Sequence, residues 1–462
     1  MKLSKKKVAI VYAQLIAIIV SNVFASSKEM DIALYGMLFA VYSVFSFSCL
    51  VFLQKRLITP INILYMTFIL FQTGVPIAYF IDSDYVNPYI NLFGNNLVLS
   101  AARYTLWSIQ AMSLVLVIAI NLENNKKKKI LFSKIGAIND KRYVYSVAKV
   151  MYIATSLIVV PLYTSVAFLT LLRGFSQEIR SLIAANAIFN LVRAFYCPSF
   201  FLLVCYGREK SFTKIAKYLF FFTCVMSLVS GNRTDGILWL ITYFYYSQTD
   251  HKNKGKNQVV LTLGFIVIIL LAVYIGQSRM SSGNVTLTSS FMNVIGEMGF
   301  NFMSICFVMS YVPAITSFKY GMTYLGSVLC MFPKTLDVLH ILDTIRYNLP
   351  AQWLYDINHR RYGTLLDFGT GFSMIGETYM NFADFGFIIC GVYALLLCQI
   401  FGGQWNKDSC WEKYVQMSLL LGFLTFPRRA MIELLNNIAY SIFFVAIILI
   451  VFYRSFEKEN IV

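Results

Sequence analysis

The amino-acid sequence predicts an all-α polytopic integral membrane protein, with about 12 transmembrane helices and one large, partly helical extracytoplasmic loop before the tenth span. Three observations carry this prediction. Hydrophobic residues make up 58% of the 462 residues and charged residues only 13%, with a mean hydropathy of +0.65, which is outside the range of soluble domains. Apolar runs of membrane-crossing length recur along the chain. Basic residues gather in alternate connections between these runs.

The spans are placed by windows of about 20 apolar residues, the length that crosses the hydrocarbon core of a bilayer. The first run is followed by polar residues and a second apolar run, so it is interpreted as a retained span and not as a cleaved signal peptide. The twelve predicted spans are residues 8–26, 32–53, 57–80, 98–120, 147–172, 185–206, 215–230, 235–248, 258–276, 385–403, 413–427 and 436–454. They divide the chain into nine spans over 1–276, an extracytoplasmic loop over 277–384 and three spans over 385–462.

Basic residues orient these spans, because Lys and Arg in short connections are retained in the cytoplasm. With both termini inside, 25 of the 39 basic residues but only 8 of the 22 acidic residues lie on the inner side, so this face accounts for the whole formal net charge of +17. The positive charge is therefore a topology signal, and no nucleic-acid partner is expected.

Outside the cytoplasmic segments the chain uses arginine in preference to lysine. A planar guanidinium grips phosphate or carboxylate with two hydrogen bonds, whereas lysine supplies a point charge. One interpretation is a shared oxyanion site; the other is that these arginines extend to the interface or pair with nearby acids. Eleven of the 14 basic residues there are arginines, namely Arg103, Arg173, Arg180, Arg193, Arg233, Arg279, Arg346, Arg360, Arg361, Arg428 and Arg429.

The stretch VSGNRTDGILW places Arg233 in a tight outer turn between predicted spans seven and eight. Gly231 and Gly236 allow the backbone to reverse within a few residues. We expect Asp235 to act as the N-cap of span eight, and the N–H groups of the turn to form, with Arg233, a seat for a phosphate. The alternative is a plain capped hairpin whose arginine extends to the interface.

The predicted outer loop 277–384 is far longer than the other connections, and long loops are usually functional. Its apolar first half, FMNVIGEMGFNFMSICFVMSYV, is interpreted as helices that lie in the interface or re-enter between spans. Its second half concentrates groups that transfer protons or bind anions, namely His359, Arg360, Arg361, Asp367 and Glu377.

Two of these groups are candidates for proton transfer. His359 is a candidate general base, and an exposed histidine without a role is the alternative. Glu377 is a candidate to bind a sugar hydroxyl, to act as the base or to pair with an arginine. Further along, FPRRAMIELLNN forms the predicted turn between spans eleven and twelve, and it places Arg428 and Arg429 at the same depth as Arg233.

Three features resemble bacterial O-antigen polymerases, the Wzy family of oligosaccharide repeat-unit polymerases. They are SGNRTDG after a span, one large extracytoplasmic loop in the C-terminal half, and GFSMIGETYMNFADFGFIICG leading into the next span. In the last motif, Ala383 stands where the family pattern has glycine. The positions that match the pattern are Gly376, Glu377, Tyr379, Asn381, Phe382 and Gly386.

The resemblance implies a membrane-embedded glycosyltransferase that joins oligosaccharide repeat units carried on undecaprenyl pyrophosphate. The reaction would take place at the outer leaflet of the bacterial cytoplasmic (inner) membrane and would build lipopolysaccharide O antigen, capsule or a related polysaccharide. The growing chain passes to the non-reducing end of an incoming lipid-linked unit, and undecaprenyl pyrophosphate leaves. Besides these oligosaccharides and membrane lipids, the implied partners are a polysaccharide chain-length regulator and a flippase.

On this hypothesis the polar residues of the outer face take two roles. Cations stabilise the leaving diphosphate, so no cofactor and no metal are expected. His359 or Glu377 orients or deprotonates the acceptor hydroxyl, and the sequence does not separate the two. The predicted pyrophosphate-binding residues are Arg233, Arg360 and Arg361, with Arg279 and Arg428 as weaker candidates.

Two other functions compete with polymerisation. An O-antigen ligase uses similar donor chemistry but passes the glycan to a lipid or protein acceptor, and the outer arginines suit it equally. A lipid-linked oligosaccharide flippase or other transporter also fits twelve spans, but such proteins usually show repeated halves and cations along a central path. The sequence has no convincing internal repeat and one long outer segment, which disfavours a transporter.

Overall fold

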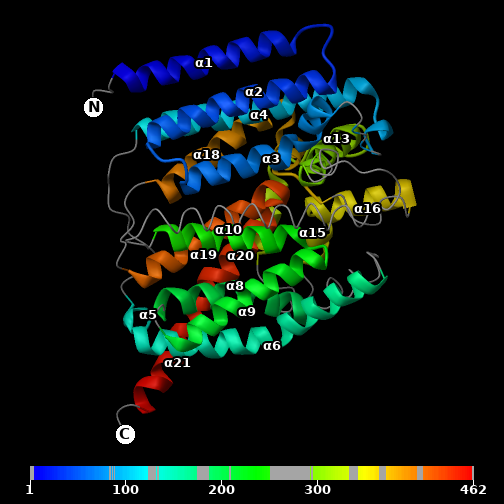
Figure 1. The fold of residues 1–462 in the computed structure, drawn as a ribbon. Coiled ribbons are helices and arrows are strands. Elements are labelled where there is room, and N and C mark those ends of the chain that lie inside the picture. The colour runs from blue at the N-terminus through cyan, green and yellow to red at the C-terminus, as the bar shows by residue number, and fades with distance from the viewer. Residues whose placement is uncertain are drawn as a thin grey trace. The chain divides into compact units, whose positions relative to one another are not determined.

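The structure is a computed structural model, and its elements are helices (Figure 1). It describes residues 5–82, 85, 87, 89–122, 132, 135–173, 187–207, 210–249, 292, 295–331, 342–363, 371–402 and 409–459. No β-strand occurs within these ranges. The prediction of an all-α, polytopic membrane protein is confirmed.

The chain forms two compact units, each built from separate stretches of sequence. Unit 1 comprises residues 1–125, 283–403 and 426–433. Unit 2 comprises residues 126–282, 404–425 and 434–462. Segments that are distant along the chain therefore pack together within each unit.

Five long helices form the body of unit 1, and Figure 1 shows them running roughly parallel to one another. Short polar side chains start two of them. Asp31 accepts a hydrogen bond from the N–H of Leu34 at 2.7 Å before the second helix, and Thr59 accepts one from the N–H of Asn62 at 3.2 Å before the third. The five are α1 (Lys5–Ala25), α2 (Ile32–Gln54), α3 (Pro60–Ile81), α4 (Asn95–Leu122) and α18 (Phe387–Phe401).

Buried polar side chains join α1, α2 and α4. The amide nitrogen of Gln14, a residue with 0% exposure, lies 2.7 Å from the hydroxyl of Tyr42. It also lies 2.9 Å from the hydroxyls of Ser46 and Ser113. Hydrogen bonds of this kind satisfy polar groups in an apolar surrounding and help to hold membrane helices together.

Shorter helices complete unit 1, and in Figure 1 α13 and α16 lie toward the end at which α1 ends and α2 begins. Nine of the eleven residues of α13 are buried, so this helix packs inside the protein. The placement of the whole segment 277–384 on the outer side stays a prediction. The shorter elements are η1 (Ile90–Leu92), α13 (Asn301–Tyr311), α14 (Met322–Leu329), α15 (Asp343–Tyr347), α16 (Pro350–Tyr362), α17 (Met374–Phe382), η4 (Ala383–Gly386), η5 (Phe426–Arg428) and the start of α20 (Met431–Ile438).

Two glycines let α3 approach the chain just before α13. A Cβ atom on Gly299 would lie 2.3 Å from the Cα atom of Gly74, and a Cβ atom on Gly74 would lie 2.4 Å from the carbonyl oxygen of Ile295. Small residues allow backbones to meet at such crossings. This contact sets the distance between α3 and the start of α13.

The helix that leads into predicted span ten begins earlier than expected. Residues 374–401 form one stretch long and apolar enough to cross a membrane, whereas the sequence predicts a start at residue 385. Polar side chains made the earlier part resemble a loop. Glu377, Thr378 and Asn381 are nevertheless buried, because other parts of unit 1 supply their hydrogen-bond partners.

Unit 2 is a second helical body with an aromatic core. Phe200 and Phe220 stack with their ring centroids 3.8 Å apart, and Tyr196 and Trp239 pack against Phe220. Such rings bury much apolar area, which stabilises the packing of the helices that carry them. The elements of unit 2 are α5 (Gly136–Asn139), α6 (Lys141–Arg173), α8 (Ala187–Tyr206), α9 (Ser211–Val229), α10 (Arg233–Thr249), α19 (Cys410–Thr425), the remainder of α20, the π-helix η6 (Ala439–Phe444) and α21 (Val445–Glu459).

Within the described residues, nine helices are long and apolar enough to span a membrane, and they overlap nine of the twelve predicted spans. Predicted spans eight and eleven are helical as α10 and α19, with 17 and 16 residues. Predicted span nine, residues 258–276, lies outside the described residues. The nine helices are 6–25, 32–54, 60–81, 95–122, 141–173, 189–206, 211–229, 374–401 and 431–453.

All nine cysteines lie within the described residues, and none of them forms a disulfide. Seven are buried, while Cys49 and Cys410 are half-buried. A buried thiol of this kind packs as a small hydrophobic side chain.

Candidate functional site

Arg428 and Arg429 lie on a short turn of unit 1, residues 426–431, here named the Arg428 turn. The turn consists of η5, two further residues and the first residue of α20. Phe426 and Pro427 are buried, whereas both arginines are half-buried. The apolar side chains thus fix the turn to unit 1, and the guanidinium groups lie nearer the surface.

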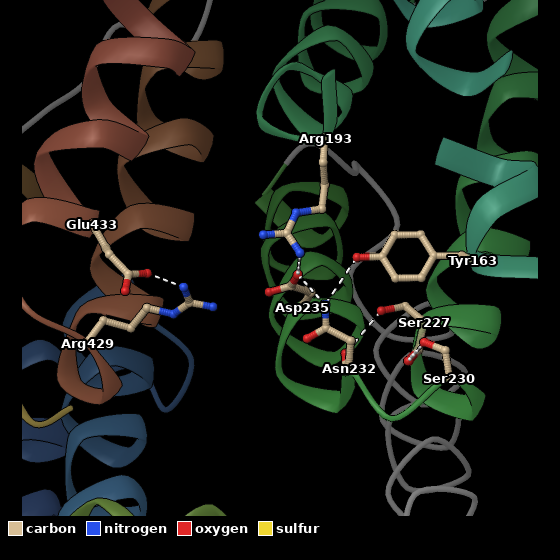
Figure 2. Close-up of polar contacts among 8 residues, drawn as sticks. All are labelled: Tyr163, Arg193, Ser227, Ser230, Asn232, Asp235, Arg429 and Glu433. Atoms are coloured by element: carbon tan, nitrogen blue, oxygen red, sulfur yellow. Dashed lines mark hydrogen bonds and ion pairs between the residues drawn. The ribbon is translucent and has the colours of Figure 1, made fainter. Parts of the chain in front are cut away.

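The two arginines make different contacts. The guanidinium carbon of Arg428 lies 5.9 Å from the ring centroid of Phe71, which is within the range of a cation–π interaction. Arg429 forms an ion pair with Glu433 four residues further along the chain (Figure 2). Arg428 is therefore the arginine of this turn that rests on an apolar surface.

The carbonyl oxygen of Pro427, directly before Arg428, is held by two buried amides. The side-chain nitrogen of Gln72 in α3 donates to it, and the side-chain nitrogen of Asn301 in α13 lies 3.3 Å from it. The amide oxygen of Gln72 accepts in turn from the Ser373 hydroxyl at 2.7 Å. Three segments of unit 1 thereby fix one side of the Arg428 turn.

Glu377 holds the other side of this turn. Its side chain is 1% exposed, and one carboxylate oxygen accepts from the backbone N–H of Met431 at 2.8 Å. The second oxygen accepts from the hydroxyl of Thr323 at 2.9 Å. Because Met431 is the first residue of α20, the Glu377 side chain satisfies an N–H group that the helix itself leaves without a partner.

Asn381, one turn after Glu377, ties α17 to the start of α14. Its side-chain nitrogen donates to the Thr323 hydroxyl oxygen at 2.7 Å and to the backbone carbonyl of Glu377 at 2.8 Å. Its side-chain oxygen accepts from the N–H of Gly321 at 2.9 Å. Glu377 and Asn381 of the motif GETYMN are thus joined through Thr323 in one buried hydrogen-bonded cluster, whereas Thr378 contacts the Tyr104 hydroxyl.

Ala383, which stands where the family pattern has glycine, adopts a backbone conformation that favours glycine. Its φ is 53° and its ψ is −140°, directly after α17. A side chain is strained at positive φ, and glycine is not. The structure therefore explains why glycine suits this position, and this chain adopts the conformation with alanine.

His359, Arg360 and Arg361 occupy the last turn of α16, and all three are exposed. The His359 ring stacks on Tyr355 with centroids 5.9 Å apart and an interplanar angle of 12°. Arg360 donates from Nε to the backbone carbonyl of Asp356 at 3.2 Å. A cation-rich helix end is thus presented at the surface of unit 1.

Arg361 and the helix that carries it are anchored on Tyr311 of α13. The guanidinium carbon of Arg361 lies 5.7 Å from the ring centroids of both Tyr311 and Tyr362. The Tyr311 hydroxyl donates to the side-chain oxygen of Asn358 at 2.7 Å. Burial raises the pKa of Tyr311 above its ordinary value, so the hydroxyl keeps its proton and remains a donor.

A second arginine-bearing turn lies in unit 2, at residues 230–236, here named the Arg233 turn (Figure 2). Gly231 has a φ of 93°, which allows the reversal that the sequence predicts. Asn232 contacts the carboxylate of Asp235 at 2.8 Å and the Tyr163 hydroxyl at 3.1 Å. Backbone contacts of Asn232 with residue 227 close the turn.

Asp235 differs from its expected place in this turn. Because α10 begins at Arg233, Asp235 lies inside the first helical turn and not at the N-cap position. Its carboxylate lies 3.5 Å from the guanidinium of Arg193 in α8, so an ion pair links the two helices. Arg193 is one of the eleven arginines that the sequence offers for an anion site, and in the structure it forms this ion pair with Asp235.

Other predicted residues fall partly or wholly outside the described residues. The backbone of Arg233 starts α10, but its side chain is not among those described. Arg279 and Asp367 also lie outside the described residues. Among the residues that the structure does describe, no group of three or more His, Cys, Asp or Glu side chains gathers in a way that would hold a metal ion.

Comparison with known proteins identifies the family. The family model for the O-antigen polysaccharide polymerase Wzy matches residues 8–460, nearly the whole chain. The chain belongs to the Wzy O-antigen polysaccharide polymerase family. No curated protein and no solved structure matches the chain. The resemblance seen in the sequence is thus confirmed, and it makes the protein a membrane polymerase of polysaccharide biosynthesis, of the glycosyltransferase type.

The polymerase brings two of its predicted site residues to one turn. Glu377 accepts from the backbone of the Arg428 turn, although 54 residues separate Glu377 from Met431. His359, Arg360 and Arg361 lie together on α16, as their sequence adjacency requires. The catalytic and pyrophosphate-binding roles of all these residues stay predictions.

Sequence reasoning missed the buried polar residues that support the Arg428 turn. Their one signal is a polar side chain within an apolar segment, which is costly in a membrane unless it finds a partner. Gln72 in FILFQTGVP is the strongest case, because it lies near the middle of a span. The missed residues are Gln72, Asn301, Thr323 and Ser373. Asn381 is visible in the sequence as a position of the family pattern, but not as a support of this turn.

Proposed function

We propose that the protein joins undecaprenyl-pyrophosphate-linked oligosaccharide repeat units at the outer leaflet of the bacterial cytoplasmic membrane. The anomeric carbon of the growing chain leaves its pyrophosphate carrier and forms a glycosidic bond with a hydroxyl of the incoming unit. The hydroxyl proton goes to a base, and undecaprenyl pyrophosphate departs. Membership of the Wzy family supports this reaction class.

The observation that carries the site proposal is the Arg428 turn. Charge grows on the diphosphate as its bond to the sugar breaks, and fixed cations stabilise that charge better than mobile ones, because they need no reorganisation. Arg428 lies half-buried on a turn whose backbone is held by Gln72 and Asn301 on one side and by Glu377 on the other. Arg428 therefore becomes the principal candidate, and not a secondary one.

The remaining arginines are assigned by exposure and position. Arg360 and Arg361 are exposed at the end of α16, where they are accessible to an anionic group. Arg233 and Arg279 keep their proposed pyrophosphate role on the basis of sequence position alone. Together these groups replace the divalent cation that many glycosyl transfers use, so the proposal needs neither a metal nor another cofactor.

His359 is the stronger candidate for the base that orients or deprotonates the acceptor hydroxyl. It is exposed, and an imidazole ring is able both to accept and to donate a proton. Glu377, in contrast, is 1% exposed and both of its carboxylate oxygens accept hydrogen bonds. An acceptor sugar reaches His359 more readily than the buried carboxylate.

The proposal includes a topology of twelve spans, with both termini in the cytoplasm and the segment before the tenth span, residues 277–373, outside. The distribution of basic residues supports it. Reporter fusions at residues 320 and 360 test it, and a cytoplasmic signal from either fusion contradicts it. A chain-length regulator and a flippase are proposed partners, in keeping with the family.

The arginine assignment is tested with the full chain in liposomes and a synthetic lipid-linked repeat unit. We expect Arg428→Ala to lower kcat by about 100-fold or more, the loss typical of removing one group that stabilises transition-state charge. Arg428→Lys should recover part of the rate, because it restores charge without the planar fork. A wild-type rate for Arg428→Ala would remove this residue from the site.

A cellular test separates the polymerase from the ligase. Deleting the protein should leave surface glycan of single repeat length, because unit attachment continues without polymerisation. Long chains that stay on the lipid carrier would instead identify a ligase. The family match favours the first outcome.

A further inference from the structure

The backbone of the Arg428 turn is held on both sides by side chains from distant segments. On the N-terminal side, Gln72 donates to the carbonyl of Pro427, the residue before Arg428. On the C-terminal side, Glu377 accepts from the N–H of Met431, two residues after Arg429. Both side chains are almost fully buried, at 0% and 1% exposure. We infer that Gln72 and Glu377 are positioning residues that set the place of the Arg428 guanidinium for the transfer reaction, an inference that rests on the proposed function.

Further hydrogen bonds fix the side chains of Gln72 and Glu377 in place. Rotation of either side chain away from the Arg428 turn would break these bonds as well. The Ser373 hydroxyl donates to the amide oxygen of Gln72 at 2.7 Å, which fixes which end of that amide faces Pro427. The Thr323 hydroxyl donates to the carboxylate of Glu377, and Asn381 donates to the same hydroxyl oxygen. A fully hydrogen-bonded buried network of this kind specifies a single geometry.

This geometry matters because a fixed cation is effective only where the leaving group forms. Arg428 reaches from the turn across Phe71, on the same helix as Gln72. A shift of the turn by about 1 Å moves the guanidinium out of register with the diphosphate, and misplacements of that size cost about 100-fold in rate. Gln72 and Glu377 act on the reaction only through the backbone of this turn.

Gln72→Leu tests the N-terminal side of the turn. The substitution removes both hydrogen bonds of the amide and replaces it with an apolar side chain of similar size. The matched control is Gln14→Leu, a change of an equally buried glutamine that contacts Tyr42, Ser46 and Ser113 and not the turn. We expect kcat to fall by about 100-fold in Gln72→Leu, and a similar fall in Gln14→Leu would overturn the inference.

A double-variant cycle separates positioning from a general structural role. Gln72→Leu is measured with Arg428 present and again in the Arg428→Ala background. If Gln72 acts through Arg428, the second measurement shows less than about a twofold further loss, because coupled residues are not additive. An equal loss in both backgrounds overturns the inference and leaves Arg428 in the site. A wild-type rate for Arg428→Ala contradicts the proposed site itself, because it removes Arg428 from the reaction.

Glu377 is tested with two replacements that differ in one property. Gln keeps an oxygen that accepts from the N–H of Met431, whereas Leu does not. We expect Glu377→Gln to be at least about tenfold more active than Glu377→Leu, since leaving a buried N–H without a partner is costly. Its rate should also depend on pH as in the wild type. Equal loss in the two variants, or a changed pH profile in Glu377→Gln, would mean that the carboxylate takes part as an acid or base.

Discussion

The two arginine-bearing turns are held in opposite ways. The Arg428 turn in unit 1 depends on partners far away in sequence, because Gln72 and Asn301 lie 355 and 126 residues from Pro427. The Arg233 turn in unit 2 is closed mainly by its own residues, since Asn232 contacts Asp235 and Ser227 at separations of three and five residues. Arg193 and Tyr163 then fasten it to two other helices.

The difference shows what determines the position of each arginine. A locally closed turn depends little on how its helices pack, so we expect the Arg233 turn to form mainly from residues 227–236. The Arg428 turn has its geometry only when α3, α13 and α17 are packed together. Substitutions in distant helices of unit 1 should therefore act on Arg428 and leave the Arg233 turn unchanged.

The largest expected effect comes from the crossing of α3 and the chain before α13. In Gly299→Ala the new Cβ would lie 2.3 Å from the Cα atom of Gly74, so α3 must move and take Gln72 with it. Overpacking of this kind costs about 3 kcal/mol, the upper end of its usual range, which should appear in thermal unfolding together with a loss of polymerase activity. Gly94→Ala is the control, because nothing lies within 4 Å of its added Cβ. Equal melting of the two variants would contradict the role of the crossing.

A smaller effect is expected at the Arg233 turn. Asp235→Leu removes the carboxylate that pairs with Arg193. Removal of one partner of a fully buried pair lowers the free energy of unfolding by several kcal/mol. Because the Arg193 side chain is 26% exposed, we expect a loss of about 2 kcal/mol. Adding Arg193→Met should recover part of the stability, and a further loss would argue against the pair. The control is Glu433→Gln, whose pair with Arg429 is about one-third exposed and contributes only about 0.5 kcal/mol.

The smallest effect is expected at Ala383, next to the helix that supports the Arg428 turn. Ala383→Gly removes a strained positive φ directly after the helix that carries Glu377, and it should raise stability by about 1 kcal/mol. Ala394→Gly, at a buried position inside α18, should lower stability by about the same amount, because glycine is unfavourable in a helix interior. The two variants are compared by thermal unfolding, and a decrease in both would argue against strain at Ala383.

Much of the fold could be predicted, because the length of an apolar run indicates a membrane helix and the basic residues between runs indicate its orientation. Nine predicted spans overlap helices of spanning length, and the glycine reversal at Gly231 was visible from the sequence. The sequence predicts too late a start for span ten, because Glu377 and Asn381 resemble loop residues until their partners are known. The sequence predicts a local cap at Asp235, whereas the ion-pair partner of Asp235, Arg193, lies in another helix.

The candidate site was less predictable, for a physical reason. Arg428 and Glu377 stand out as charged residues in an apolar chain, but nothing in the order of residues says that the Glu377 carboxylate meets the N–H of Met431. A single polar residue such as Gln72 in an apolar span indicates that a hydrogen-bond partner exists, but the sequence does not show which residue it is. Long-range hydrogen bonds of this kind become visible only when the helices are packed.

The shielding of the thiols has a practical consequence for the study of this polymerase. Seven of the nine cysteines are buried, so replacing Cys49 and Cys410 should leave a chain that reacts slowly with maleimide reagents. A single cysteine introduced on the exposed end of α16 then becomes a specific attachment point for a fluorophore or spin label. Such a probe would follow the arrival of a lipid-linked sugar in real time.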